Sequence, residues 1–381
     1  MRNINIPRPI GIPTPMAHER LCKCLAENWG DIRNHFEKMT SGDNIKISRI
    51  HVRKMKDTEA LFLMNYKNWR IDGTPDPEIT LGKKYVVHAD ISKCFPSIYS
   101  HAIPWALVGK NEAKKNNHNK SEWYNQIDYW TQRSKNGETH GLLIGPHTSN
   151  ILSEIILCKI DFELKKKYEY IRNIDDYSCF VKSKDEADQF LIDLNCELEK
   201  YDLAINHKKT EICELPMATV EQWVNQIENK IVTFGRFQQY VDYKEVRSLI
   251  DYSINLMENN SRDTAILFYA LKVLSGKAKD GQPKYNLTDN AKKYVVQKMV
   301  TLSLLYPYIV SWLDEYVFTP FGAEKEDIEK FAKLIYDSNL TKRNYEACSY
   351  SLYFAIKYDC CLDTVFDIDE VKKQMIVFFL Y

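Results

Sequence analysis

Three aspartates are the residues of this sequence whose types and positions suggest chemistry. Asp175 and Asp176 are adjacent within the stretch 170–180, where apolar and β-prone residues on both sides predict a hairpin. On this stretch alone, a polar turn is an equally good interpretation, because aspartate is common in turns. A third aspartate, Asp90, ends a short β-branched stretch from Lys84 onward, which predicts a strand.

A cluster of these three carboxylates would favour divalent cations. If the hairpin and the strand are neighbours in one sheet, the three side chains meet, and their charges repel one another unless cations neutralise them. Oxygen ligands of this kind suit Mg²⁺, which keeps several waters and takes further ligands from phosphates. A pair of such ions activates an attacking 3′-hydroxyl and stabilises a leaving pyrophosphate. The pattern therefore points to nucleotidyl transfer.

The elements that would position these aspartates lie in the first part of the chain. Four prolines in the eleven residues 5–15 exclude a helix there. Alternation of apolar and polar residues predicts a half-buried strand over 44–55, with Arg49 and Arg53 among its basic residues. Helical periodicity predicts helices over 17–36, 148–167 and 185–201.

The character of the chain changes near Pro216. Strand patterns become rare after this residue, and amphipathic stretches follow one another at 243–258, 262–276, 288–304, 305–317, 324–338, 342–358 and 367–380. Helix pairs packed side by side fit this pattern best, although no repeat motif identifies a repeat type. We therefore expect two domains, 1–216 and 217–381.

Composition argues against several classes of protein. The sequence has no apolar run of about 18 residues and no cleavable signal, so neither a membrane span nor secretion is expected. Ten cysteines without a C-x-x-C pair indicate free thiols in a reducing cytoplasm. The net charge is zero, but residues 1–110 hold 17 Lys/Arg against 11 Asp/Glu, so the first part of the chain is its basic part.

Four segments follow one another in the order of a known motif set. They are 90–107, 141–149, 170–177 and 203–210, with Leu215-Pro216 closing the last. In this order and spacing they resemble the palm motifs of reverse transcriptases, and more closely those of the bacterial abortive-infection and defence-associated branch. The resemblance covers about residues 5–216. It implies an α+β fold with right-hand polymerase palm and fingers, followed by an all-α, helical-repeat-like domain that replaces the thumb, encloses the product and helps oligomerise.

The resemblance also implies a set of metal ligands. Asp90 and Asp175 would hold two Mg²⁺ ions, with Mn²⁺ as an alternative, and Asp176 would be a weaker or indirect partner. The carbonyl of Ile91 would complete the coordination of the metal on the nucleotide side.

The incoming nucleotide would lie beside the first two motifs. Backbone amides from Ser92 to Phe95 would meet the triphosphate, and the Phe95 ring would collide with a ribose 2′-hydroxyl, which favours deoxynucleotides. Gly145 would let the backbone lie close to the template and the nucleotide. Lys209 would stand near the pyrophosphate as a proton donor or counter-charge. Phe95 as a plain core residue and Lys209 as a solvated lysine are the alternatives.

Other residues of these segments have weaker assignments. By analogy with polymerase fingers, Arg49 and Arg53 are candidate phosphate clamps, although both can simply decorate a strand face. His88 and His101 flank the first motif and are better explained as structural histidines than as metal ligands. Asn173 stands where the third motif usually carries an aromatic residue near the primer end, so primer handling or fidelity is expected to differ.

Three hypotheses follow for the function. The leading one is an RNA-directed DNA polymerase in anti-phage defence, which uses deoxynucleoside triphosphates, a dedicated non-coding RNA as template, and either self-assembly or a second defence protein, and which makes a DNA product. The first alternative is template-independent or repetitive nucleotide addition by the same fold. The second is a non-catalytic RNA-binding scaffold, which the intact acids argue against, because a scaffold has no reason to keep a self-repelling cluster.

Overall fold

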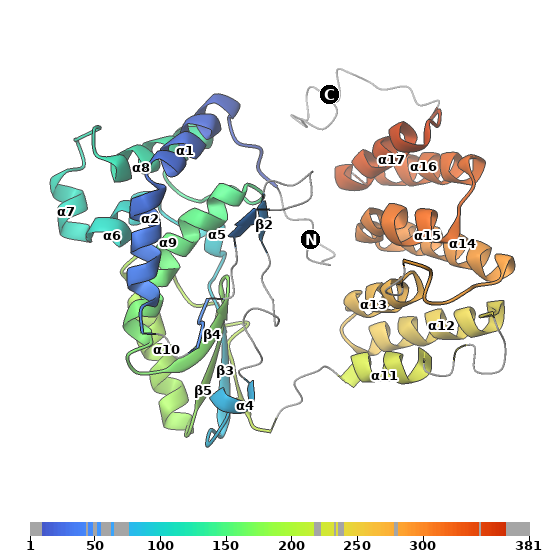
Figure 1. Ribbon diagram of the computed structural model, residues 1–381, viewed down its shortest axis with the longest axis horizontal. Coiled ribbons are helices and arrows are strands. Elements are labelled where there is room, and N and C mark those ends of the chain that lie inside the picture. Colours follow the sequence, from blue (N-terminus) through green and yellow to red (C-terminus); the bar gives the residue numbers. More distant parts are fainter. Residues whose placement is uncertain are drawn as a thin grey trace. The chain divides into compact units, whose positions relative to one another are not determined.

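The computed structural model describes residues 10–42, 45–48, 52–54, 62–64, 76–216, 222–231, 234, 240–277, 281–342 and 344–362, with only the backbone of 52–54, 62–64, 76 and 77. These residues form two compact units, a first unit that ends at Pro216 and a helical unit that begins at Gln222 (Figure 1). Arg49 and the predicted helix 367–380 lie outside the described residues.

An antiparallel sheet is the centre of the first unit. In the described part of the chain its strands stand in the order β4 (Glu169–Asn173), β5 (Asp176–Val181), β3 (Tyr85–Asp90) and β6 (Glu211–Glu214). The register places Asp90 opposite Asp176 and Asn173 opposite the same Asp176. The predicted strand before Asp90 and the predicted hairpin are therefore confirmed, and they are direct neighbours.

Helices and a small ribbon make up the rest of the first unit. The helices are α1 (Pro15–Glu27), α2 (Trp29–Thr40), α4 (Asp76–Ile79), α5 (Cys94–Ser97), α6 (Ala102–Val108), α7 (Lys110–Lys115), α8 (Trp123–Ser134), α9 (His147–Leu164) and α10 (Lys184–Glu199). Of the predicted strand 44–55, the described residues 45–48 form no strand, and Val52–Lys54 form β1, which pairs with β2 (Phe62–Met64).

The two faces of the central sheet differ. Tyr177, Cys179 and Val181 alternate along β5 into a buried face, which α9 and α10 cover. The helix α10 begins with the Ser183 side chain accepting from the amide of Glu186, a standard N-cap. Because side chains alternate along a strand, Asp90 and Asp176 belong to the opposite face, which these two helices leave uncovered.

The predicted single helix over 17–36 is wrong, because the structure has two. Asn28 separates α1 from α2, with φ −105° and ψ 19°, outside helical values. Its side-chain amide donates to the carbonyl of Cys24 at 2.8 Å and so closes the end of α1. Such local side-chain bonding is why asparagine favours helix ends.

The helical unit stacks its helices in chain order, as Figure 1 shows from yellow to red. They are α11 (Gln222–Ile231), α12 (Tyr243–Asn259), α13 (Ala265–Leu274), α14 (Asp289–Leu305), the 3₁₀ helix η1 (Pro307–Trp312), the π-helix η2 (Asp314–Phe318), α15 (Thr319–Phe321), α16 (Lys325–Leu340) and α17 (Tyr345–Tyr358). A single helix over 305–317 was expected, and the structure corrects this to η1 and η2, since Pro307 at the start of η1 prevents continuation of α14.

The described chain therefore belongs to the α+β class, with its sheet in the first unit. Within the described ranges, none of the helices combines the length and the apolar character that a bilayer crossing requires.

Candidate active site

The three aspartates of the sequence analysis meet at one end of the central sheet. Asp90 ends β3, Asp176 begins β5, and Asp175 lies in the turn between β4 and β5. One carboxylate oxygen from each of the three lies within 4.8 Å of the others. Asp90 is only 5% exposed, whereas Asp176 is exposed. The structure thus places one buried and two more accessible acids in a single cluster.

Main-chain hydrogen bonds hold this cluster from two directions. The amide of Ile91, directly after Asp90, donates to the carbonyl of Asp175 at 3.2 Å. The amide of Asn206 donates to the carbonyl of Asp90 at 2.7 Å. The end of β3 is therefore tied both to the turn with Asp175 and to the segment that follows α10.

Two side chains from that following segment converge on one oxygen of Asp90. Lys209 Nζ lies 2.6 Å from Asp90 Oδ2, and Asn206 Nδ2 donates to the same oxygen at 3.1 Å. The other oxygen, Asp90 Oδ1, is buried and has no hydrogen-bond partner among the residues that the structure describes. Sequence analysis gave no role to Asn206, although it lies in the fourth motif.

The unsatisfied oxygen of Asp90 is what a bound cation would explain. A buried polar atom without a partner costs free energy, and a metal ion ligated there would remove this cost. All three side chains offer carboxylate oxygens, which are the ligands that hard divalent cations such as Mg²⁺ and Mn²⁺ prefer. Lys209 pairs with Asp90 Oδ2, and Asp90 Oδ1 has no partner among the described residues, so this oxygen can ligate a cation. The residues present therefore fit divalent metal ions.

The amide of Ser92, which is expected to meet a triphosphate, has a main-chain partner in this structure. This amide donates to the carbonyl of Ala204 at 2.8 Å, and the carbonyl of Ser92 accepts from Ser97 Oγ at 3.1 Å. Ile91 forms an isolated bridge with Ile205 in the same place. The chain after Asp90 thus continues the sheet for two more residues. The amide of Ser92 is one of the bonded groups of this continuation.

Phe95 lies on the short helix α5 and is half-buried against the core of the first unit. Its carbonyl accepts from the amide of Leu142 at 2.7 Å, and the carbonyl of Ile98 accepts from the amide of Gly141 at 2.8 Å. A Cβ at Gly141 would lie 2.8 Å from the carbonyl oxygen of Pro96, so this approach requires glycine. The first and second motifs therefore form one packed unit.

Gly145 faces the N-terminal segment in this structure. It has φ +127°, and a Cβ there would lie 2.7 Å from Ile10 Cγ2. The amide of Gly11 donates to the carbonyl of Ile144 at 2.8 Å. The proline-rich start of the chain thus runs along the second motif. Its contact with Gly145 explains why a residue without a side chain stands there.

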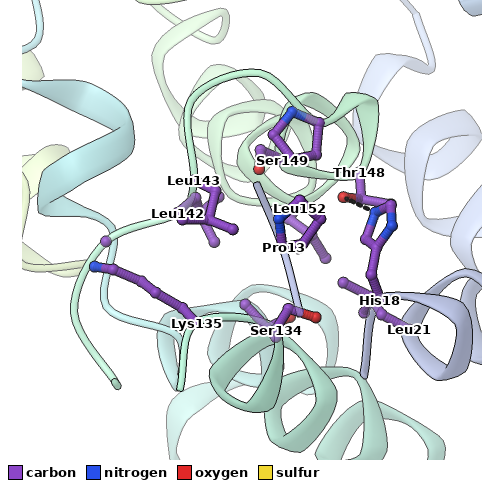
Figure 2. A pocket seen from close by; sticks show the side chains of 13 residues that line it. Pro13, His18, Leu21, Ser134, Lys135, Leu142, Leu143, Thr148, Ser149 and Leu152 are labelled. Atoms are coloured by element: carbon purple, nitrogen blue, oxygen red, sulfur yellow. Dashed lines mark hydrogen bonds between the residues drawn. The ribbon is translucent and has the colours of Figure 1, made fainter. Parts of the chain in front are cut away.

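A small cavity lies nearby, lined by Pro13, Leu142 and Leu152 among others (Figure 2). Its volume is about 20 Å³, enough for a water molecule and far too small for a nucleotide. At its edge His18 Nε2 lies 3.2 Å from Thr148 Oγ1, the dashed line in Figure 2. Burial lowers the pKa of His18. This cavity is a packing feature of the second motif.

The remaining candidate residues are two arginines, whose side chains the structure does not describe, and two histidines with partners of their own. Arg49 is outside the described residues, and Arg53 lies in β1, where only the backbone is described. His88 Nδ1 lies 3.2 Å from Ser178 Oγ, and His101 Nδ1 forms a short contact with Asp128 Oδ2. The structure thus gives both histidines partners outside the acid cluster.

A sheet with clustered acids on one face and helices on the other is the arrangement of a polymerase palm, and its acids fit the divalent metals of nucleotidyl transfer. The reverse transcriptase (RNA-dependent DNA polymerase) family matches residues 38–259, which is more than half of the chain. The chain therefore belongs to the reverse transcriptase family, whose members are RNA-directed DNA polymerases, a class of nucleotidyltransferase.

Several solved telomerase structures are similar to the chain. Apo telomerase from Candida tropicalis, truncated from the C-terminal domain, is 18% identical with a TM-score of 0.28, over 38% of this chain and 33% of that one. Telomerase from Candida albicans with a TWJ fragment of telomeric RNA is 11% identical with a TM-score of 0.27, over 85% and 54%. The chain thus spans about a third to a half of these structures. No curated protein matches it.

The His101–Asp128 pair predicts a pH-dependent contribution to stability. The hydrogen bond that His101 donates to the Asp128 carboxylate raises the pKa of His101, against a smaller opposing effect of burial. A raised pKa means that the stabilisation is fully present below the unfolded-state pKa of about 6.5 and is lost as pH rises through the folded-state value. We expect His101→Gln to lower the thermal midpoint most at about pH 5.5, with a shrinking difference at alkaline pH.

Thermal unfolding of wild type and His101→Gln across this pH range measures the effect. In an Asp128→Asn background, the effect of His101→Gln on the thermal midpoint is expected to be the same at every pH. A difference between wild type and His101→Gln that is constant with pH contradicts the assignment.

Proposed function

We propose that this chain is a reverse transcriptase that adds deoxynucleotides to a 3′-hydroxyl under the direction of an RNA template. The observation that carries the proposal is the cluster of Asp90, Asp175 and Asp176 with an unsatisfied buried oxygen on Asp90, in a chain of this family. We further propose Mg²⁺ as the metal, with Mn²⁺ as an alternative, held chiefly by Asp90 and Asp175.

The residues of the site divide the work of the reaction. Bound divalent ions supply the charge that activates the 3′-hydroxyl and stabilises the leaving pyrophosphate. We propose that the aspartates hold these ions at the end of the sheet, and that the carbonyl of Ile91 completes the coordination of the metal on the nucleotide side. Lys209, which pairs with Asp90 at 2.6 Å, is free to turn to the pyrophosphate once a cation takes its place, and there it donates a proton or balances charge.

Phe95 is proposed as the group that selects deoxynucleotides. The hydrogen bond from the amide of Leu142 to the carbonyl of Phe95 fixes the backbone of Phe95 relative to the second motif. A bulky ring held in this way excludes the 2′-hydroxyl of a ribonucleotide by collision, and repulsion of this kind is a common basis of specificity.

Residues 1–216 are proposed as fingers and palm, and 217–381 as a helical domain that replaces the thumb and contacts nucleic acid. In the helical unit, a groove of about 1040 Å³ is lined by Lys272, Lys277 and Lys292 and by Tyr240 and Tyr285. Among the described residues no carboxylate forms an ion pair with Lys272 or Lys277. Lysines beside aromatic rings suit single strands, because the charges meet phosphates and the rings stack on bases.

Biological partners are proposed from the resemblance to the defence-associated branch. These are a dedicated non-coding RNA as template, a DNA product, and self-assembly or a second defence protein, in anti-phage defence. Template-independent or repetitive nucleotide addition by the same site is the alternative, which Asn173 in place of the usual aromatic residue leaves open.

Nucleotide incorporation tests the central activity. The full chain is offered each labelled deoxynucleotide and ribonucleotide separately, with Mg²⁺, before and after RNase treatment. We expect deoxynucleotide incorporation that Asp175→Asn lowers by at least about 10³-fold, because a central electrostatic group is removed. The exposed Asp188→Asn on α10 is the matched control and is expected to keep full activity.

The outcomes of this assay separate the hypotheses. Loss of incorporation after RNase treatment supports an RNA template, and persistence indicates untemplated addition. Absence of incorporation under all conditions, with RNA still bound, supports the scaffold instead.

The Phe95→Ala variant tests nucleotide selection. We expect the ratio of kcat/KM for a deoxynucleotide to that for its ribonucleotide to fall by about tenfold or more, the scale of steric discrimination in a pocket. Steady-state kinetics with both substrates measure the ratio, in which a general folding defect cancels. An unchanged ratio shows that Phe95 is only a packing residue.

The groove of the helical unit predicts a change in salt dependence. Lys272→Gln/Lys277→Gln is expected to reduce the slope of log K against log salt for single-stranded oligonucleotides by about 1.4, since each phosphate contact contributes about 0.7. Fluorescence anisotropy at several salt concentrations measures the slope. The exposed pair Lys330→Gln/Lys333→Gln on α16 is the control, and an equal change in both variants contradicts a role for the groove.

A further inference from the structure

A buried ionic cluster lies next to the turn that carries Asp175. Arg172 of β4 has no exposed surface, and Glu154 and Asp161 of α9 are 9% and 5% exposed. Arg172 Nη2 lies 2.6 Å from Asp161 Oδ2 and 3.0 Å from Glu154 Oε1. The other guanidinium nitrogens reach the same two acids, Nε to Asp161 at 2.9 Å and Nη1 to Glu154 at 3.1 Å.

Further hydrogen bonds fix the two acids themselves. Tyr170 donates its hydroxyl to Asp161 Oδ1 at 2.9 Å, and Cys158 donates its thiol to Glu154 Oε1 at 3.0 Å. Burial acts to raise the pKa of Glu154, but the charge and hydrogen bonds of Arg172 outweigh it and hold this pKa below its usual range. Burial raises the pKa of Asp161. The cluster is therefore a hydrogen-bonded, fixed base between α9 and the sheet.

One hydrogen bond joins this cluster to the turn between β4 and β5, which carries Asp175. Arg172 Nη1 also donates to the carbonyl of Ile174 at 2.8 Å, and Ile174 directly precedes Asp175. Ile174 has φ +60°, a left-handed conformation that β-branched residues rarely adopt. On the other side of the turn, the carbonyl of Asp175 accepts a hydrogen bond from the amide of Ile91. A strained turn next to a functional residue persists only where surrounding contacts determine it.

We infer that Arg172 is a positioning residue for the acid cluster: by holding the carbonyl of Ile174 from the fixed base of Glu154 and Asp161, it sets the place of Asp175. This inference rests on the proposed function. A guanidinium is required because only a planar fork binds two carboxylates and a carbonyl at once, whereas a lysine ammonium is a point charge. Stability alone does not require the charges, since apolar residues often replace buried ion pairs without loss.

The experiment compares metal affinity with stability in the full chain. Arg172→Lys keeps the charge and loses the fork, and Leu194→Ala on α10, where Leu194 is 1% exposed, destabilises the same unit without touching the turn. Mn²⁺ binding is measured by electron paramagnetic resonance without nucleotide, together with thermal midpoints and, for active variants, kcat and KM. We expect Arg172→Lys to weaken Mn²⁺ binding at least tenfold and to lower kcat more than it changes KM.

Leu194→Ala is expected to shift the midpoint and leave Mn²⁺ affinity unchanged. Ile174→Gly, which removes the strain of the turn, is expected to recover at least threefold of the Mn²⁺ affinity in the Arg172→Lys background. If Arg172→Lys does not fold, Glu154→Gln carries the test, with an expected loss of at least threefold in Mn²⁺ affinity.

Three results would overturn the inference. They are unchanged Mn²⁺ affinity in a folded Arg172→Lys or Glu154→Gln variant, an equal loss in Leu194→Ala, or no recovery with Ile174→Gly. Failure of the proposed function looks different, because wild type would then bind Mn²⁺ no better than Asp175→Asn does.

Discussion

Electrostatic repulsion among three carboxylates is the constraint on which the first unit depends. Two unit charges about 4 Å apart repel by about 4 kcal/mol at the effective dielectric constant of a protein surface, and here three acids lie within 4.8 Å of one another. Lys209 offsets part of this repulsion at Asp90, and divalent cations are suited to offset the rest. The chain keeps an arrangement that opposes folding, and a metal site gives a reason for it.

The architecture around the cluster serves to hold the three acids in place. Antiparallel pairing of β3 with β5 fixes Asp90 opposite Asp176, and the amide of Ile91 ties the strand to the turn. The other face of the sheet packs on α9 and α10, so the acids stand on a rigid base. Sites built on strands in this way are positioned more accurately than sites on loops.

The sequence was sufficient where local pattern decides structure. The β-branched run before Asp90 predicted β3, the apolar periodicity of 148–167 predicted α9, and the acid pair marked the hairpin. Helix α11 was missed although it is amphipathic, because it spans only ten residues. The break at Asn28 was missed because a single side-chain hydrogen bond leaves no periodic signal.

Long-range partners could not be predicted. The pairing of Lys209 with Asp90 joins residues 119 positions apart. The amide of Ser92 donates to the carbonyl of Ala204, which is also far along the chain. Sequence analysis assigned no role to Arg172, because its two acids on α9 reach it only when the helix packs on the sheet. Side-chain partners of this kind depend on tertiary contacts, which residue spacing does not encode.

The most direct test of the account is anomalous X-ray diffraction from crystals grown with Mn²⁺, primer and template, and a non-hydrolysable deoxynucleotide. The account predicts Mn²⁺ peaks bound by Asp90 and Asp175, with Asp90 Oδ1 as a ligand and Lys209 turned away from Asp90. No Mn²⁺ at the three aspartates, with Lys209 still paired to Asp90, would contradict it.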